Sequence, residues 1–382
     1  MNARLMIAAV ATLGLLAGCA GKVEPQYPPK ELRDLSPTAR TTTLWSERAG
    51  AGLGRGSYPM APAQDGSRVF AADHRGLVTA LDTNSGRTLW ETTLDSGASS
   101  ALSAVDGQLY LGTRNGEVVA LDQTSGKVLW KTETSSEVLA APQANRELLV
   151  VQSVDGNITA LDRTNGTERW SYSASQPALS LRASATPRVI DAVTIAGLAN
   201  GRLVTLDNRT GQPLWERRIA TPTGNNEIER LSDLAGQPLL TPDGRLYATS
   251  YNGRLVALDA TSGQVAWSQA LSSYRSPLIV GDTLFVVDEA SHVIAMNALS
   301  GSELWRLNDL EGRGLTEPEF AGGYLVLGDY EGYLHLIDPQ SGKLAGRTRI
   351  DSSGLSVAPQ TDGRRIYVQA NDGTLEALEV HQ

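Results

Sequence analysis

The sequence is poor in cysteine and has no surplus of positive charge. Its 382 residues include a single Cys, and 33 Lys and Arg stand against 42 Asp and Glu, for a net charge of −9. One thiol cannot form an internal disulfide framework, a zinc ribbon or a Cys-ligated iron–sulfur cluster, because these need pairs or quartets of Cys. A nucleic-acid-binding surface needs a surplus of Lys and Arg to neutralise phosphates. The composition therefore argues against such sites and against nucleic acid as a partner.

The N-terminus also lacks an apolar run long enough to cross a membrane. The run that it has, Leu5–Leu16, contains twelve residues. As a helix it would reach about 18 Å, against about 30 Å for the hydrocarbon core of a bilayer. A run of this length behind a positive charge, Arg4, is typical of a secretory signal peptide.

The residues after this run resemble the bacterial lipoprotein box. They read Leu16-Ala17-Gly18-Cys19, and Cys19 is the only Cys of the chain. In that motif the Cys is acylated, for example with palmitate, and becomes the first residue of the mature protein. The resemblance implies a signal peptide over residues 1–18 and lipidation of Cys19. Ala20 is not the Asp that retains lipoproteins at the inner membrane, so the resemblance implies an outer-membrane lipoprotein facing the periplasm.

The segment that follows is polar and rich in proline. Residues 19–40 contain four Pro and no apolar period. This composition predicts a flexible, extended tether between the lipidated Cys and a folded body. The remaining residues, 41–382, then form one domain.

One repeated unit fills that domain. Its clearest copies read GLVTALDTNSGRTLW (76–90), GEVVALDQTSGKVLW (116–130) and GNITALDRTNGTERW (156–170). The acidic or Asn position of the unit recurs eight times, at Asp82, Asp122, Asp162, Asp207, Asp259, Asn297, Asp338 and Glu379. Successive positions lie 38–52 residues apart. A repeat of this length is typical of closed or stacked repeat folds.

Each unit reads as four β-strands. A short segment often marked by Pro and a β-rich run such as QLYLG (108–112) precede the alternating strand of the motif, and a strand with Trp follows it. In the Asp-x-x-x-Gly turn between the last two strands, the Asp carboxylate accepts backbone N–H groups and the Gly adopts a positive φ. Four-stranded units of this size predict the antiparallel blades of a β-propeller.

The two chain ends decide the number of blades. The eighth unit stops at Gln382 before its fourth strand, whereas Trp45 lies in a strand with no unit before it. If the N-terminal strand around Trp45 completes the last blade, the ring closes and leaves no open interface. We therefore predict an all-β fold, an eight-bladed propeller of four-stranded blades. A seven-bladed ring, the alternative, leaves the first or last unit unpaired.

The Trp residues occupy one position of the unit. Six follow the Asp or Asn of the turn by eight residues, and the seventh is Trp45 of the orphan strand. This regularity favours structural docking between blades, with each indole N–H bonded to the adjacent backbone, over a stacking platform for sugars or bases. The seventh unit has Gly346 where Trp is expected, which predicts a looser interface there. The predicted docking residues are Trp45, Trp90, Trp130, Trp170, Trp215, Trp267 and Trp305.

Motifs for catalysis or metal binding are missing. The four His lie in different units at unrelated positions, which predicts isolated surface or loop side chains and no metal site. The sequence contains no Gly-x-Ser-x-Gly elbow, P-loop or HExxH motif. We therefore expect no catalytic residues, no metal and no cofactor.

The AL-D-x-x-x-G-x-x-x-W unit resembles the tryptophan-docking repeat of the pyrroloquinoline-quinone (PQQ) propellers. In one branch, the quinoprotein dehydrogenases, the propeller holds PQQ and calcium with a vicinal Cys pair and a catalytic Asp. A single Cys cannot supply that pair. The other branch is the BamB family of lipoprotein propellers, which belong to the outer-membrane β-barrel assembly (BAM) machinery. The resemblance to this family covers essentially the whole mature chain.

Two irregular stretches carry this second resemblance. They are PALSLRASATP (177–187) and the insertion ATPTGNNEIERLSDLAGQP (220–238). Both are similar to BamB segments, LSLR and TGxxEIxRLSD, that form the surface docking the barrel-forming subunit BamA. The resemblance implies that BamA is bound by Leu179, Leu181, Arg182 and Asp233. A second acidic residue that the family often has is Ala235 here.

The resemblance implies a non-enzymatic scaffold that is held at the outer membrane by its lipid. It would bind the periplasmic domains of BamA within the BAM complex and assist the assembly and insertion of β-barrel outer-membrane proteins, whose unfolded forms are further candidate partners. Three alternatives remain open at this point. The first is that Leu179 and Leu181 are inward strand residues and not a docking surface, because they have the required period-two spacing. The second and third are that the propeller is a PQQ-dependent periplasmic oxidoreductase or a binder of periplasmic sugars or peptidoglycan.

Overall fold

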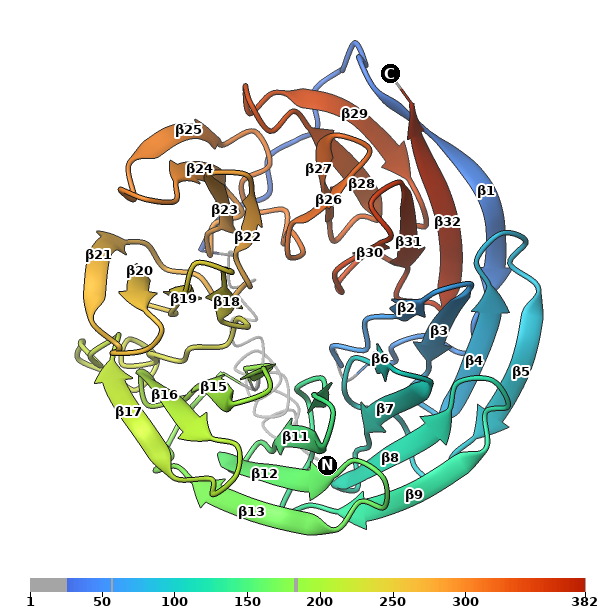
Figure 1. Cartoon of the computed structure of the whole chain (residues 1–382). Helices are drawn as coiled ribbons and strands as arrows, with labels where there is room; N and C mark the ends of the chain where they lie inside the picture. Colours follow the sequence, from blue (N-terminus) through green and yellow to red (C-terminus); the bar gives the residue numbers. More distant parts are fainter. Residues whose placement is uncertain (1–25, 56–57, 182–184, 382) are drawn as a thin grey trace, which may run out of the picture.

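The computed structural model describes residues 26–55, 58–181 and 185–381. Within these ranges the chain forms eight antiparallel sheets of four strands, arranged as blades around a ring (Figure 1). The prediction of an all-β, eight-bladed propeller is therefore confirmed. The described ranges contain no helix that is long and apolar enough to span a membrane. The predicted signal peptide (1–18), Cys19 and Arg182 lie outside them.

In seven blades the four strands follow one another from the ring axis outward (Figure 1). The first four of these blades are formed by β2 (Ala63–Asp65), β3 (Arg68–Ala72), β4 (Leu77–Asp82) and β5 (Thr88–Thr93); β6 (Ser103–Val105), β7 (Gln108–Gly112), β8 (Glu117–Asp122) and β9 (Val128–Glu133); β10 (Gln143–Ala144), β11 (Leu148–Gln152), β12 (Asn157–Asp162) and β13 (Glu168–Ser173); and β14 (Arg188–Val189), β15 (Val193–Gly197), β16 (Arg202–Asp207) and β17 (Pro213–Arg218).

The next three blades repeat this order, and the last blade joins both ends of the described chain. These blades are formed by β18 (Leu239–Leu240), β19 (Arg245–Thr249), β20 (Arg254–Asp259) and β21 (Val265–Ala270); β22 (Leu278–Val280), β23 (Thr283–Val287), β24 (Val293–Asn297) and β25 (Glu303–Leu307); β26 (Glu319–Ala321), β27 (Tyr324–Gly328), β28 (Tyr333–Ile337) and β29 (Leu344–Arg349); and β30 (Gln360–Thr361), β31 (Arg365–Gln369), β32 (Thr374–His381) and β1 (Arg40–Arg48).

Burial explains why the middle strands are nearly continuous apolar runs and the outer strands are not. In β4 the four residues from Val78 to Leu81 are all buried, because both faces of a middle strand pack against neighbouring blades. In β5 the residues alternate between partly buried and exposed along most of the strand. The outer edge of each blade is therefore half solvated.

The ring closes through the first strand. β1 pairs with β32 in an antiparallel register that places Arg40 opposite His381 and Trp45 opposite Ala377. The N-terminal strand thus completes the last blade, as predicted, and the seven-bladed alternative is excluded. Closure of this kind leaves no open interface between the first and the last blade.

Every Trp makes the same contacts between two blades. Its indole N–H donates to the carbonyl of the residue that follows the turn Asp or Asn of the next blade, at 2.6–3.1 Å. Its ring covers the Gly of that turn so closely that an added Cβ would lie 2.4–2.8 Å from ring atoms. Across its own sheet each Trp faces a small residue, in order Ala377, Ala80, Ala120, Ala160, Thr205, Ala257 and Ala295.

The interface at Gly346 is filled, so the prediction of a looser contact there is wrong. Leu336 lies opposite Gly346 where the other blades have a small residue, and the Ala39 carbonyl would be 2.4 Å from an added Cβ. Leu336 and Ala39 are each 1% exposed. The cause is the chain ends: β32 and β1 are not joined by an Asp-x-x-x-Gly turn, so a Trp at this position would have no turn to dock on.

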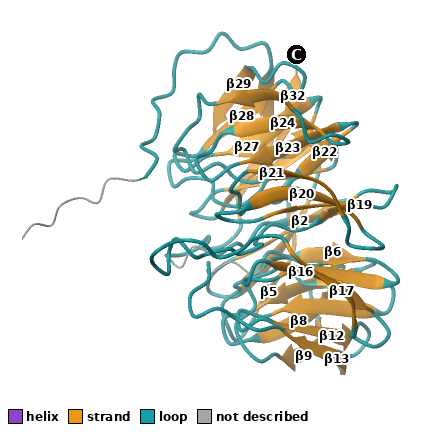
Figure 2. Ribbon diagram, turned by 90° about the vertical axis from the view of Figure 1, so that its left-hand side faces the viewer, coloured by secondary structure: helices purple, strands orange, loops and turns teal. Residues whose placement is uncertain are grey.

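The segment before β1 is not a free tether over its described length. Tyr27 donates a hydrogen bond to Glu289, Lys30 bonds Glu311 through backbone and side chain, and Ala39 N–H bonds Ala345 O at 3.0 Å. Figure 2 shows this segment rising along the outside of the ring towards β29 and β32. The proline-rich composition predicts an extended chain, but it carries no signal for these contacts with residues some 260–310 positions away.

Replacing Gly346 with Trp tests this account of the last interface. The repeat pattern alone favours Trp at this position, whereas the structure places Ala39 and Leu336 in the space that the indole would need. We expect Gly346→Trp to lower the free energy of unfolding by about 1–3 kcal/mol, the usual cost of overpacking, measured by urea denaturation. An unchanged or increased stability would contradict the account.

Candidate docking surface

The connections between strands lie on two opposite faces of the ring. Links from the second to the third strand of a blade, and from the fourth strand to the next blade, share one face, called here the loop face. The Asp-x-x-x-Gly turns lie on the other, called here the turn face. The segments 177–187 and 220–238 each link a fourth strand to the next blade, so both lie on the loop face.

The first segment is an irregular loop between β13 and β14. Residues 174–181 contain no strand, so the alternative that Leu179 and Leu181 are inward strand residues is wrong. Leu179 is 44% exposed and Leu181 is partly buried. The loop thus presents at least one apolar side chain to solvent, and Arg182 follows directly in the sequence.

The second segment anchors itself with its own side chains. Leu231 and Leu234 are buried, at 8% and 2% exposure, and hold the end of the insertion to the ring. Before them, both carboxylate oxygens of Glu229 accept hydrogen bonds, from Asn225 N–H at 2.6 Å and from the Asn226 amide at 2.8 Å. These bonds give an exposed loop a defined shape.

Between these anchors, the insertion exposes one large apolar residue that the sequence reasoning missed. Ile228 is 67% exposed, and Asn252 of a neighbouring loop lies 3.4 Å from the Ile228 carbonyl. An isolated apolar residue in a run of polar ones was the available signal. Glu227 is also exposed, and its Oε1 lies 3.6 Å from Nη1 of Arg230. Because the carboxylate of Glu229 is bonded within the loop, Glu227 is the acidic side chain that this part of the insertion presents to solvent.

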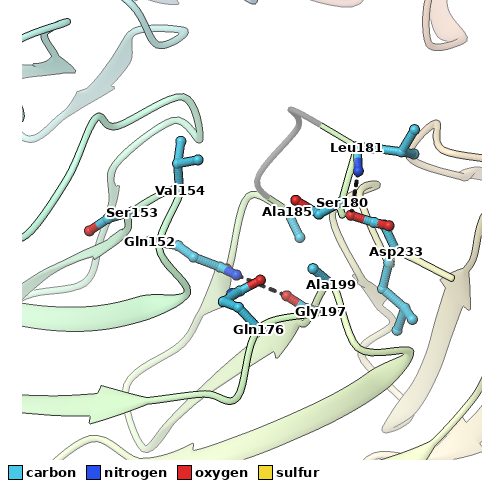
Figure 3. Close-up of a pocket in the computed structure, with 11 residues that line it drawn as sticks. Gln152, Ser153, Val154, Gln176, Ser180, Leu181, Ala185, Gly197, Ala199 and Asp233 are labelled. Atoms are coloured by element: carbon cyan, nitrogen blue, oxygen red, sulfur yellow. Dashed lines mark hydrogen bonds between the residues drawn. The ribbon is translucent and has the colours of Figure 1, made fainter. Parts of the chain in front are cut away.

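Asp233 joins the two segments. Its Oδ1 accepts the Leu181 N–H at 2.9 Å (Figure 3), and the side chain is 1% exposed. Burial raises the pKa of Asp233 to about 7, although hydrogen bonds from backbone N–H groups, Leu181 foremost, act in the opposite direction. The implied role of Asp233 as a direct partner contact does not fit this burial. The geometry makes it a positioning residue that fastens the loop of Leu179 and Leu181 to the insertion.

A small polar cavity lies beneath this contact. It measures about 20 Å³ and is lined by Gln152, Gly197 and Asp233 among others (Figure 3). Gln152 donates a hydrogen bond to the Gly197 carbonyl at 3.0 Å, and Leu181 directs its side chain away from these residues (Figure 3). Ligand pockets usually enclose about 300–1,000 Å³, so this cavity cannot hold a small-molecule substrate.

The described residues contain no group of three or more His, Cys, Asp or Glu placed to hold a metal ion. One His differs from the expected surface or loop position. His335 lies in β28, is fully buried, and places Nε2 2.8 Å from Oδ2 of Asp329, which also accepts a hydrogen bond from buried Arg313 at 2.8 Å. This pairing satisfies the carboxylate within the ring.

Comparisons with known proteins agree with this arrangement. A family model described as "Outer membrane protein assembly factor BamB" matches residues 31–112, 102–307 and 289–382. A relative of the same name from Pseudomonas aeruginosa is 44% identical over 374 residues, covering 98% of each chain. The crystal structure of BamB from Moraxella catarrhalis superposes with a TM-score of 0.82 at 29% identity, over 89% of this chain and all of that one. A europium-containing methanol dehydrogenase, 14% identical with a TM-score of 0.74 over 89% of this chain and 93% of its own, shares the fold.

Substituting Asp233 tests its buried state. Because its folded-state pKa of about 7 lies above the ordinary 3.8, the folded wild type binds more protons than the unfolded chain between these values. It therefore loses stability as pH rises from about 4 to 7, at no more than about 1.4 kcal/mol per pH unit. Asp233→Asn has no such titration.

Urea unfolding of both proteins between pH 5 and pH 8 measures this effect. We expect the Asn variant to gain stability relative to wild type up to about pH 7, after which the difference stays constant. A difference that is constant over the whole range would contradict the buried, raised-pKa state of Asp233.

Proposed function

Because the chain belongs to the BamB family of outer membrane protein assembly factors, we propose that it is a non-enzymatic scaffold of the BAM complex that binds the periplasmic region of BamA through its loop face. In this role it helps β-barrel outer-membrane proteins to assemble and insert. The proposed docking surface consists of the loop 177–187 and the insertion 220–238.

The observation that carries the proposal is the exposed apolar loop held in place by a buried bond. Leu179 is exposed on a loop that no strand supports, and the Asp233 carboxylate fixes that loop at Leu181 N–H. A surface that is ordered before it binds loses less conformational entropy on binding. The leucines offer apolar surface to a partner, and Arg, which the sequence supplies at position 182, is among the residue types enriched at binding hot spots.

The second part of the proposal concerns the membrane. The family name places these proteins at the outer membrane, and we propose that acylated Cys19 anchors this chain there with the ring in the periplasm. Unfolded outer-membrane proteins are proposed as transient partners, since sheet edges can hold extended strands by main-chain hydrogen bonds.

The oxidoreductase and sugar-binding alternatives are not favoured. The relatives are named as assembly factors and not as enzymes, and the chain has one Cys where a vicinal pair is needed for the PQQ site. The seven indoles have their N–H groups and one ring face occupied between blades. They are therefore not available as a platform for sugars.

Binding of purified BamA periplasmic domains tests the docking surface. Burying one Leu side chain contributes about 1.5–3 kcal/mol, so removing two leucines from the interface should cost at least about 2 kcal/mol of binding free energy, which is about 30-fold in Kd. We expect Leu179→Ala/Leu181→Ala to weaken binding by at least this factor and Arg182→Glu to weaken it as well, measured by pull-down and titration.

Two exposed leucines elsewhere provide a matched control. Leu214 and Leu304 are 58% and 54% exposed on the outer strands β17 and β25, so Leu214→Ala/Leu304→Ala should leave the affinity unchanged. Absence of binding by the wild-type protein, or an equal loss in both double variants, would refute the proposed surface.

A further inference from the structure

The segment Tyr27–Ala39, called here the strap, crosses the rim of the ring from one face to the other. It begins on the loop face, where the Tyr27 hydroxyl donates to Glu289 Oε1 at 2.9 Å in the link between β23 and β24. Burial and the nearby Glu289 raise the pKa of Tyr27 to about 12, so the hydroxyl stays a donor. The strap ends beside Ala345, the second residue of β29, near the turn face.

The loop-face end of the strap is fastened by several independent contacts. Lys30 Nζ lies 2.8 Å from Glu311 and donates to the Asn308 carbonyl at 3.1 Å, while Lys30 N–H bonds the Glu311 carbonyl at 2.9 Å. Gly312 has a φ of +73°, and an added Cβ would lie 2.6 Å from the carbonyls of Tyr27 and Pro28. The link between β25 and β26 is thus shaped to receive the strap.

Arg313 and Asp329, a buried ion pair, lie beneath the strap and hold it at Lys30. Arg313, 2% exposed, donates to the Lys30 carbonyl at 3.0 Å and to Asp329 at 2.8 Å. Further along, Leu32 packs against an apolar cluster that includes Leu310, and Arg347 donates to the Arg33 carbonyl at 3.2 Å. The strap therefore has polar and apolar contacts along its course over the blade β26–β29.

We propose that the strap decides which face of the ring lies towards the membrane. The proposal rests on the acylation of Cys19 proposed above. Eight residue steps separate Cys19 from Tyr27, and an extended chain covers about 3.5 Å per step, so the lipid lies within about 28 Å of the loop face. The strands β28 and β29, five and six residues long, span about 20 Å between the two faces before the loops are added. The docked strap leaves the ring at the loop face, so the shorter route from the lipid to the ring places that face nearer the bilayer.

Without the strap this restriction on the orientation of the ring is lost. β1 begins at the turn-face end of its blade, because Arg40 pairs with His381 at the end of β32. A chain free from Cys19 to Ala39 would leave the ring at the turn face and reach about 70 Å when extended. The strap carries the chain back across the rim, so the lipid surface and the proposed BamA surface share the loop face.

The test uses energy transfer from a single labelled Cys to acceptor lipids. Cys19 is the only Cys and is consumed by acylation, so one new Cys is the only reactive thiol. Ser352 follows β29 on the loop face and Gln340 precedes it on the turn face, and both are exposed. Full-length lipidated protein carrying Ser352→Cys or Gln340→Cys is bound to phosphatidylethanolamine–phosphatidylglycerol vesicles. We expect energy transfer to the lipids to be several-fold greater from position 352 than from position 340.

Releasing the strap should remove this asymmetry. Tyr27→Ala/Lys30→Ala/Leu32→Ala deletes strap contacts outside the β-sheets, and we expect transfer from the two positions to become similar while the thermal unfolding transition stays cooperative. Glu31 and Asp34 are exposed and make no hydrogen bond or ion pair with the part of the chain that the structure describes. Glu31→Ala/Asp34→Ala is therefore the matched control and should keep the full asymmetry.

The outcomes separate this proposal from the previous one. Equal transfer from both positions in floating wild-type protein, or an asymmetry unchanged in the strap variant, would overturn the orienting role of the strap. Protein that fails to float with vesicles would contradict acylation of Cys19 and the orientation with it. Protein that shows the asymmetry but does not bind BamA would contradict the docking surface and leave the strap proposal standing.

Discussion

The antiparallel pairing of β1 with β32 is the contact on which the rest of the structure depends. It joins the two ends of the described chain, completes the eighth blade and closes the ring. The same pairing accounts for the exception in the repeat. Because strands from opposite ends of the chain meet there, the last blade has no turn between its outer strands, and Gly346, Leu336 and Ala39 replace the Trp contact used at the other seven interfaces.

The alternating direction of the strands gives the ring two different faces. The turn face carries short, repeated turns in seven blades, and their Gly and carbonyl groups receive the indoles. The loop face carries the irregular links, including the loop of Leu179 and the insertion that ends in Leu231 and Leu234. The strap runs to the same face, so the surface proposed to bind BamA and the proposed route to the membrane are set by one chain topology.

Much of the fold follows from the sequence, because a period of about 40 residues and the Asp-x-x-x-Gly turn with its Trp are local signals repeated many times. The position of Trp45 before the first unit was enough to predict how the ring closes. The state of Asp233 was not predictable: its burial and its bond to Leu181, 52 positions away, depend on two loops meeting. The filled space at Gly346 and the docked strap were not predictable for the same reason. Both depend on contacts between residues hundreds of positions apart.

We propose that one face of the closed ring is shaped before binding to receive BamA. Amide hydrogen exchange with and without the periplasmic domains of BamA tests this most directly. We expect slower exchange in residues 177–181 and 226–234, with no change in the turns 82–86 and 122–126 on the opposite face. Protection of those turns, with the two loop segments unaffected, would contradict it.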